Sequence, residues 1–332
     1  MARTRVIIGL SAVAITARED GGPQVLVTGH GAGGILALPF GSFDPDGHRT
    51  FELAVRDFVS SQTGLALGWV EQLYTFGDKG REAPRAETGA DMAPSDRVVS
   101  VGYLALVPQA AEPGSGLASW SAWERFFPWE DRRPVARVRA QAALVAIQAG
   151  LELWIEADPD AGGRAVRQAR AATLFGLAGE PWRDDRVLER YELLYEAGLV
   201  PEAARDRARA RGEPFDEVTG AARATGEPMA SDHRRILATA IGRLRSKLRY
   251  RPVALDLMPE TFTLSDLQLL AEGITGLPLH KSNFRRAVEK SGLVVPTGTL
   301  RTETGGRPAQ LFTRAASGPI APGGLQIPVL KG

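Results

Sequence analysis

Alternating and β-branched hydrophobic positions dominate the first hundred residues. They predict strands over residues 4–19, 24–28, 66–78 and 97–108. The glycine-proline turn at 21–23 joins the first two strands as a hairpin. Basic residues precede the first apolar run, as in a secretory signal, but no small-residue cleavage site follows. We therefore interpret this run as a buried first strand.

One helix interrupts these strands. Phe51, Val55, Phe58 and Val59 recur at helical spacing between residues 50 and 61. Thr63 and Gly64 follow as a stop signal, with the glycine at the left-handed C-cap position. The N-terminal part is thus predicted to be a sheet with one well-placed helix.

The middle of the chain is helical after an aromatic segment. Residues 113–119 predict a flexible joint, and five aromatic residues follow within ten positions: Trp120, Trp123, Phe126, Phe127 and Trp129. We expect this cluster to dock its segment onto a core. Residues 134–211 carry helical patterns, with Asp184 as an expected N-cap. Residues 212–230 are rich in Gly, Pro, Ala and Thr and predict a linker.

The C-terminal pattern has the order of a winged helix-turn-helix. Ile236, Ala240, Leu244 and Leu248 line one face of a helix over 232–249. A short strand over 252–259, a helix with a Thr263–Asp266 capping box, a second helix over 281–290 and two strands follow. Residues 316–332 predict a mobile tail.

Net charge is divided unevenly along the 332 residues. The chain as a whole carries +1, but residues 232–315 hold 14 Lys and Arg against 7 Asp and Glu, a net +7. Such asymmetry favours a nucleic-acid-binding module joined to a different domain, although a solvated basic face remains the alternative. The chain contains no Cys, which excludes disulfides and thiolate metal sites and fits a reducing, cytoplasmic location. No apolar run is long enough for a membrane span, so we expect no membrane partner.

Residues 38–65 resemble the Nudix box, G-x5-E-x7-R-E-U-x-E-E-x-G-U, in which U is aliphatic. Aligned on Gly64-Leu65, the metal-binding Glu pair of that motif falls on Ser61 and Gln62, and its Arg-Glu falls on Asp57 and Phe58. Magnesium prefers carboxylate oxygens, which Ser and Gln lack. The nearby Glu52 and Asp57 point away from each other on a helix. We therefore expect a Nudix-like fold without a catalytic residue or a metal site. The four His residues show no metal-binding spacing.

Two further segments, 72–81 and 96–108, together with the C-terminal piece 232–313, resemble the Nudix-related transcriptional regulators of the NrtR family. The long helical middle is similar to the alpha-proteobacterial NadQ-type branch. The resemblance implies an α+β chain: a Nudix-like α/β/α sandwich over 1–230, with a helical insertion and linker over 113–230, then a winged helix over 231–315. It implies a homodimeric repressor of NAD biosynthesis genes that binds operator DNA and an adenine nucleotide effector (NAD, ATP or ADP-ribose).

Candidate DNA contacts follow from residue type. In the helix over 281–290, Phe284 and Val288 face the core, and Asn283 and Arg286 share the outward face. Asn suits adenine and Arg suits guanine in the major groove, whereas a Lys at the helix start suits phosphate. The full predicted DNA-binding set is Lys281, Asn283, Arg285, Arg286, Lys290, and Arg301 and Arg307 in the wing.

Candidate effector contacts lie in the first domain. Phe43, Tyr74 and Phe76 could stack on an adenine or nicotinamide ring, and Arg49 and Arg81 could meet a pyrophosphate. Two other classes of function stay open at this point: an active Nudix pyrophosphatase with a tethered DNA-binding domain, and an interaction module whose winged helix binds protein.

Overall fold

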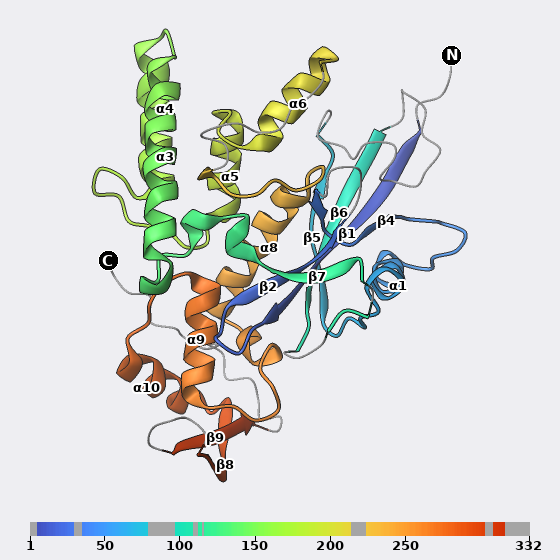
Figure 1. Ribbon diagram of the computed structural model, residues 1–332, viewed down its shortest axis with the longest axis vertical. Helices are drawn as coiled ribbons and strands as arrows, with labels where there is room; N and C mark the ends of the chain where they lie inside the picture. Colours follow the sequence, from blue (N-terminus) through green and yellow to red (C-terminus); the bar gives the residue numbers. More distant parts are fainter. Residues whose placement is uncertain are drawn as a thin grey trace.

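The structure is a computed structural model that describes residues 5–29, 35–78, 97–108, 112–114, 116–213, 224–302 and 308–315. Its centre is a mixed sheet (Figure 1) built from β1 (Val6–Ala17), β2 (Pro23–Gly29), β3 (Leu36–Ala37), β4 (Phe40–Ser42), β5 (Val70–Phe76), β6 (Arg97–Leu106) and β7 (Ala118–Ala122). The order is β3-β2-β1-β6-β5, with β4 also pairing with β1 and β7 with β2. Only the β1–β6 pair among these is parallel. The predicted hairpin and strands are confirmed.

Alternation along β1 sends side chains to both faces of this sheet. Leu10, Ala12 and Ala14 pack with α1 (Phe51–Thr63). Val13 and Ile15 belong to the larger core on the opposite face, where α8 (His233–Leu248) packs. The sheet is therefore held between α1 and α8, which is an α/β/α sandwich.

The one N-terminal helix forms as its caps predict. Thr50 accepts a hydrogen bond from the Leu53 amide at the N-cap, and Gly64 closes the C-terminus in the left-handed region, at a φ of 74°. Arg56 then fixes the helix to the chain that follows it, because its guanidinium donates to the carbonyls of Leu67 and Gly68. Helix and following loop form one rigid edge of the sandwich.

The helical insertion comprises α3 (Arg137–Glu156), α4 (Ala161–Phe175), α5 (Val187–Glu196) and α6 (Pro201–Arg211). Four of the five aromatic residues before it are in the core, as expected: Trp123, Phe126, Phe127 and Trp129. Trp120 is only partly buried and packs against the cluster on the α1 face. Two short 3-10 turns, Trp123–Arg125 and Pro128–Glu130, carry the two buried tryptophans, and the two phenylalanines lie between the turns. Residues 118–119 of the predicted flexible joint instead begin β7, which pairs with β2.

The winged helix follows α8 and contains α9 (Leu264–Thr275), α10 (Lys281–Ser291), β8 (Val294–Arg301) and β9 (Ala309–Arg314). The capping box is confirmed: Thr263 Oγ1 accepts from the Asp266 amide at 3.1 Å, and Asp266 Oδ2 accepts from the Thr263 amide at 2.9 Å. Phe284 and Val288 are fully buried, as their spacing predicts. Residues 316–332 lie outside the described part.

Two local predictions are wrong. The strand expected over 252–259 is a 3-10 helix, Val253–Asp256, and the pairing with the wing occurs later, as a single bridge between Phe262 and Phe312. Pro252 and Pro259 restrict the backbone of this stretch and withhold two ladder donors. Asp184 does not cap α5, because the N-cap residue is Arg186, which makes no side-chain capping bond. The carboxylate of Asp184 pairs with Arg249 instead.

Helix α8 contacts β1, β5 and β6 of the sheet, α5 of the insertion and α9 of the winged helix. The expected boundary at 230/231 assigns α8 to the winged helix, and that division stays a prediction. Physically the helix is shared by all three parts of the molecule. None of the described helices is long and apolar enough to cross a membrane.

Candidate nucleic-acid interface and nucleotide domain

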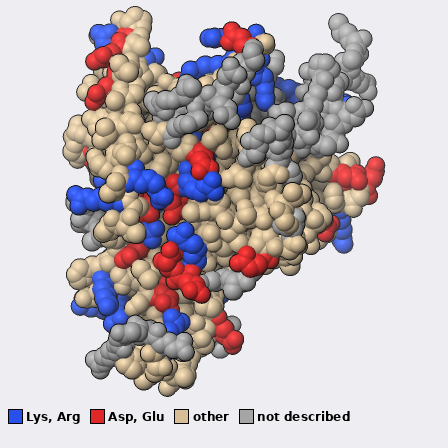
Figure 2. Space-filling model, in the orientation of Figure 1, with Lys and Arg blue, Asp and Glu red and all other residues tan. Residues whose placement is uncertain are grey.

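Helix α10 presents a polar and basic face whose candidate DNA-binding side chains form no ion pair with the rest of the described chain. Lys281, Asn283, Arg285, Arg286 and Lys290 are all exposed. Within the described residues none of these five side chains makes a hydrogen bond or an ion pair. Asn283, Arg286 and Lys290 follow each other at spacings of three and four, on the side away from the buried Phe284 and Val288. Figure 2 shows basic side chains on the surface over α10 at the lower left.

The two wing residues of the predicted DNA set differ from this face. Arg301 ends β8 and pairs with Asp266 Oδ2 at 3.0 Å, so its charge is partly committed to the start of α9. Arg307 lies outside the described residues. The wing is itself tied to α9 by two backbone bonds between Phe262 and Phe312, at 3.0 and 2.8 Å.

Most of the basic residues on α8 form ion pairs within the molecule, and the charge count alone does not reveal these pairs. The residues that pair with acids of β5, of the loop after β5 or of the insertion and the segment before it are Arg234, Arg235, Arg243, Arg245, Lys247 and the C-cap residue Arg249. The +7 of residues 232–315 is therefore not one continuous basic surface. Among the described residues of this segment, the basic side chains without a pair are the four on α10 and Arg251.

One of the fully buried pairs places a carboxylate between two guanidinium groups. Glu130 accepts from Arg190 at 2.6 and 2.9 Å and from Arg245 at 2.5 Å, and all three side chains are at most 1% exposed. Burial alone would raise the pKa of Glu130, but the two guanidinium groups outweigh it and hold that pKa below its usual range. The pair stays ionised at neutral pH and ties the insertion to α8.

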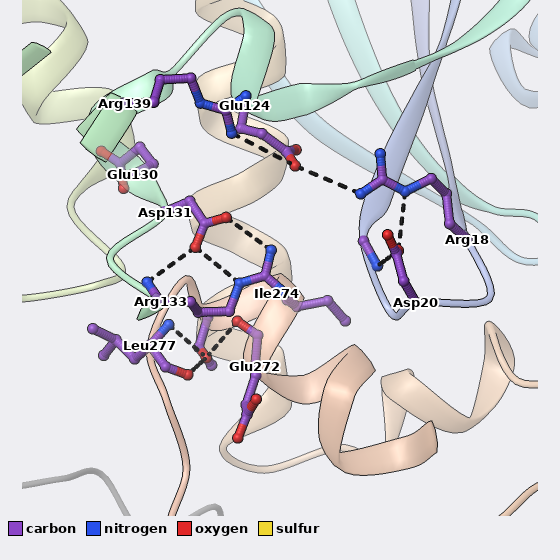
Figure 3. Close-up of polar contacts among 12 residues, drawn as sticks. Arg18, Asp20, Glu124, Glu130, Asp131, Arg133, Arg139, Glu272, Ile274 and Leu277 are labelled. Atoms are coloured by element: carbon purple, nitrogen blue, oxygen red, sulfur yellow. Dashed lines mark hydrogen bonds and ion pairs between the residues drawn. The ribbon is translucent and has the colours of Figure 1, made fainter. Parts of the chain in front are cut away.

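The same segment reaches the winged helix. Arg245 also donates to the Ile274 carbonyl at 2.8 Å, and the Arg132 amide donates to the Gly276 carbonyl at 2.7 Å at the end of α9. Figure 3 shows Glu130 next to Asp131. It also shows the ion pair between Asp131 and Arg133, and Glu272 of α9 on the other side of that pair. Sequence reasoning missed this junction, although Arg234, Ala238, Ile241 and Arg245 recur at spacings of four, three and four. Basic residues within an apolar stripe indicate buried charges.

The positions that correspond to the Nudix metal ligands have other tasks. Ser61 is exposed and its hydroxyl donates to the Phe58 carbonyl at 3.0 Å. Gln62 donates to the Phe40 carbonyl at 2.7 Å and so joins α1 to β4, while its own amide oxygen is buried without a partner. Among the described residues no group of three or more His, Cys, Asp or Glu could hold a metal ion.

The predicted effector residues do not meet in one place. Phe43 packs edge-on against Phe51 on the α1 face, with ring centroids 4.6 Å apart, and Arg49 is exposed just before α1. Phe76 belongs to the core on the other face, where the Arg235 guanidinium lies 5.2 Å from its ring. Tyr74 is 61% exposed on β5. Arg81 lies outside the described residues.

Two hollows exist near this sheet. A cavity of about 20 Å³ between β1, β4, β6 and the start of α8 includes His233, whose Nδ1 accepts from the Leu38 amide at 3.0 Å. A wider open groove of about 540 Å³ is lined by Gln24, Trp120 and residues 112–114. Neither hollow is lined by the four described residues of the predicted effector set.

Comparison with known proteins agrees with the C-terminal geometry. Residues 254–313 match the family of the NrtR DNA-binding winged helix domain. This segment is similar to the NrtR winged helix. A curated relative, the ADPR responsive transcriptional repressor NtrR of Acinetobacter baylyi, is 43% identical over 84 residues. The match covers 25% of this chain and only 33% of that repressor, so the chain spans about a third of the relative's length in that match.

The whole chain has the fold of NrtR. Shewanella oneidensis NrtR in complex with a 27mer DNA covers 93% of each chain, with a TM-score of 0.50 and 21% identity. A MutT/nudix family protein from Enterococcus faecalis has a TM-score of 0.50 and 14% identity and covers 95% of this chain and 88% of its own. These likenesses establish the predicted fold, a Nudix-like domain followed by the NrtR winged helix.

Proposed function

We propose that this chain is a DNA-binding transcriptional repressor of NAD biosynthesis genes, regulated by an adenine nucleotide that its Nudix-like domain binds without cleaving. The observation that carries the proposal is the free polar face of α10 on an NrtR winged helix. Two copies acting as a homodimer would present two such helices to the half-sites of an operator. The domain division at 230/231 and the individual DNA contacts belong to the same proposal.

Chemistry assigns roles along α10. Asn283 offers an amide that can pair with adenine N6 and N7, and Arg286 a fork that can pair with guanine O6 and N7. Lys281 at the helix start, and Arg285 and Lys290 beside the outward face, are placed to neutralise phosphates. Arg301 and Arg307 add wing contacts to the backbone or the minor groove.

ADP-ribose is the nucleotide that we favour, because the related Acinetobacter repressor responds to it; NAD and ATP share its adenylate part. Of the predicted effector residues, Phe43 and Arg49 flank the turn before α1. Tyr74 would contribute from β5 and Arg81 from the segment after it, whereas Phe76 is buried on the α8 face and does not meet Phe43. Coupling to DNA would run through α8, which touches both the sheet and α9.

The absence of hydrolysis follows from residue chemistry. Where the Nudix motif has its Glu pair, the chain offers a hydroxyl bonded to its own helix and an amide bonded to β4. Neither group carries the charge that holds magnesium, and without the metal the attacking water is not activated. The competing function is a Nudix pyrophosphatase with a tethered winged helix, which requires magnesium-dependent turnover.

The test is the salt dependence of binding to duplex DNA selected by the purified protein from a random-sequence pool. A protein that neutralises phosphates loses affinity steeply as salt rises, with a log–log slope of about −0.9 for each phosphate. We expect a steep slope and retention of a discrete sequence. Selection of no sequence, or an affinity that salt leaves unchanged, would reject DNA binding and favour a protein-binding winged helix.

A further inference from the structure

Helix α3 is apolar on two opposite faces. Ala140, Ala143, Ile147 and Leu151 are buried against the rest of the insertion. On the other side Val138, Val145 and Leu153 are 87%, 58% and 69% exposed. The exposed Ala142 and Ala149 fill the gaps between them. The resulting α3 stripe (138, 142, 145, 149 and 153) recurs every three or four residues, which is the spacing of a helix–helix seam.

The α3 stripe is symmetric about its own centre. Inverting the helix around the midpoint between residues 145 and 146 places Val138 opposite Leu153 and Ala142 opposite Ala149. Large residues then sit at both ends and small ones between them, so the stripe matches a reversed copy of itself. This is the self-complementarity that an isologous contact needs, in which residue i meets j and j meets i.

Charges beside the stripe are arranged in the same sense. Arg137 flanks its N-terminal half, and Glu152 and Glu156 lie on the same side of its C-terminal half. The same inversion brings Arg137 of one copy level with residue 154 of the other, between Glu152 and Glu156. A parallel pair would instead place like charges together. Arg137 is exposed, and Glu152 accepts one bond from Gln148, so both can take a further partner.

We propose that the α3 stripe is a self-association surface that pairs antiparallel with α3 of a second copy of this chain. The inference is independent of the proposed function. The N-terminal end of α3 follows directly on the segment that contacts α9, and the helix then runs away from the winged helix (Figure 1). In an antiparallel pair the two winged helices therefore lie at opposite ends of a helix about 30 Å long. The contact therefore joins two separate DNA-binding units. It does not hold two recognition helices at the spacing of adjacent half-sites, which is about 34–36 Å.

Cysteine crosslinking tests the register directly, because the chain has no Cys of its own. A disulfide forms only where Cα atoms come within about 7 Å. Val145→Cys, at the centre, is expected to form a covalent dimer under mild oxidation. Val138→Cys alone should not, whereas a mixture of Val138→Cys and Leu153→Cys chains should. Leu53→Cys, an equally accessible apolar site on α1, is the matched control.

Charge exchange gives a second readout on the uncrosslinked full chain. Arg137→Glu and Glu152→Arg should each weaken self-association in sedimentation velocity by roughly tenfold, and the double exchange should restore it. The proposal is overturned if Val138→Cys crosslinks with itself, if Leu53→Cys crosslinks equally well, or if the double exchange fails to restore association. It is also overturned if Val145→Cys crosslinks only after residues 316–332 are deleted, since the tail would then cover the stripe.

Discussion

The carbonyl oxygen of Gly21 lies against Gly273: a Cβ on Gly273 would be only 2.1 Å from it. Gly21 is the turn of the β1–β2 hairpin, with a φ of 75°, and Gly273 is in α9. The tip of the sheet hairpin therefore touches the helix that precedes α10 directly. This contact connects the β1–β2 hairpin to the winged helix, in addition to the contact that α8 makes.

Gly273→Ala is expected to separate the hairpin from α9. The added methyl cannot fit against backbone, so the two elements must move apart, at a cost of about 1–3 kcal/mol in the free energy of unfolding. DNA affinity should change with it, because α9 leads into α10. Gly116→Ala, at a position with no neighbour within 4 Å, is the control. Urea unfolding and DNA titration of both variants check this. Equal behaviour of the two would show that the contact does not matter.

Arg286→Ala and Lys281→Ala should affect DNA binding differently. Loss of a bidentate base contact is expected to cost about 1–3 kcal/mol and to relax specificity at one position of the site. Loss of a phosphate contact should weaken binding to all sequences and reduce the salt slope by about one. Arg211→Ala, which removes one exposed charge from the end of α6, should do neither. Titrations with the selected duplex and single-base variants measure the difference. A uniform effect of Arg286→Ala would remove it from the base-reading set.

Local signals predicted much of this fold. The hairpin, the Gly64 C-cap, the Thr263 capping box and the buried Phe284 follow from a few neighbouring residues, so they could be read from the sequence. The ion pairs of α8 could not, because Glu130 and Arg245 are 115 residues apart and neither residue alone indicates the other. The charge count over residues 232–315 therefore included cations near α8 that are paired with acids inside the molecule.

The effector site shows the same limit. Aromatic and basic residues were chosen by type, yet strand alternation sends Phe76 to the α8 face while Phe43 packs on the α1 face. A one-residue difference in strand register decides the face of a side chain, and a sequence fixes this register only through packing. The position of Gln62 was predicted through the Nudix motif, but its bond to the Phe40 carbonyl was not.

Glu130→Gln is expected to destabilise the protein by about 3–5 kcal/mol at neutral pH, because two guanidinium groups lose their buried counter-charge. The pKa of Glu130 is lowered in the folded state, so its contribution is present above the unfolded pKa and is lost as the pH falls through the folded one. The difference in unfolding free energy between wild type and Glu130→Gln should therefore become smaller under acid conditions. Urea unfolding across this range measures it.

Glu227→Gln is the matched control for that pair. Its partner Arg125 is 46% exposed, and a solvent-screened pair of this kind is worth about 1 kcal/mol or less. Two results would show that the buried cluster does not hold the insertion. One is a difference in unfolding free energy between Glu130→Gln and wild type that does not change with pH, and the other is a loss of unfolding free energy no larger than that of Glu227→Gln.

Gln62→Glu restores one carboxylate of the Nudix motif and tests whether the domain can then hydrolyse a nucleotide. The substitution exchanges the amide donor to the Phe40 carbonyl for an acceptor, which should cost about 1–3 kcal/mol in unfolding free energy. Ser61→Glu, at an exposed position, should cost far less. Neither variant is expected to hydrolyse ADP-ribose with magnesium, since one acid does not make a metal site. Turnover in Gln62→Glu would mean that the rest of the catalytic site is intact.

The central claim is that a nucleotide bound by the Nudix-like domain changes DNA binding without being consumed. The most direct measurement is fluorescence anisotropy of the selected duplex, titrated with protein at fixed salt with and without saturating ADP-ribose and magnesium, followed by chromatography of the nucleotide. We predict a change in DNA affinity of at least about fivefold, with ADP-ribose recovered intact. An unchanged DNA affinity, or conversion of ADP-ribose to AMP at an enzymatic rate, would contradict the account.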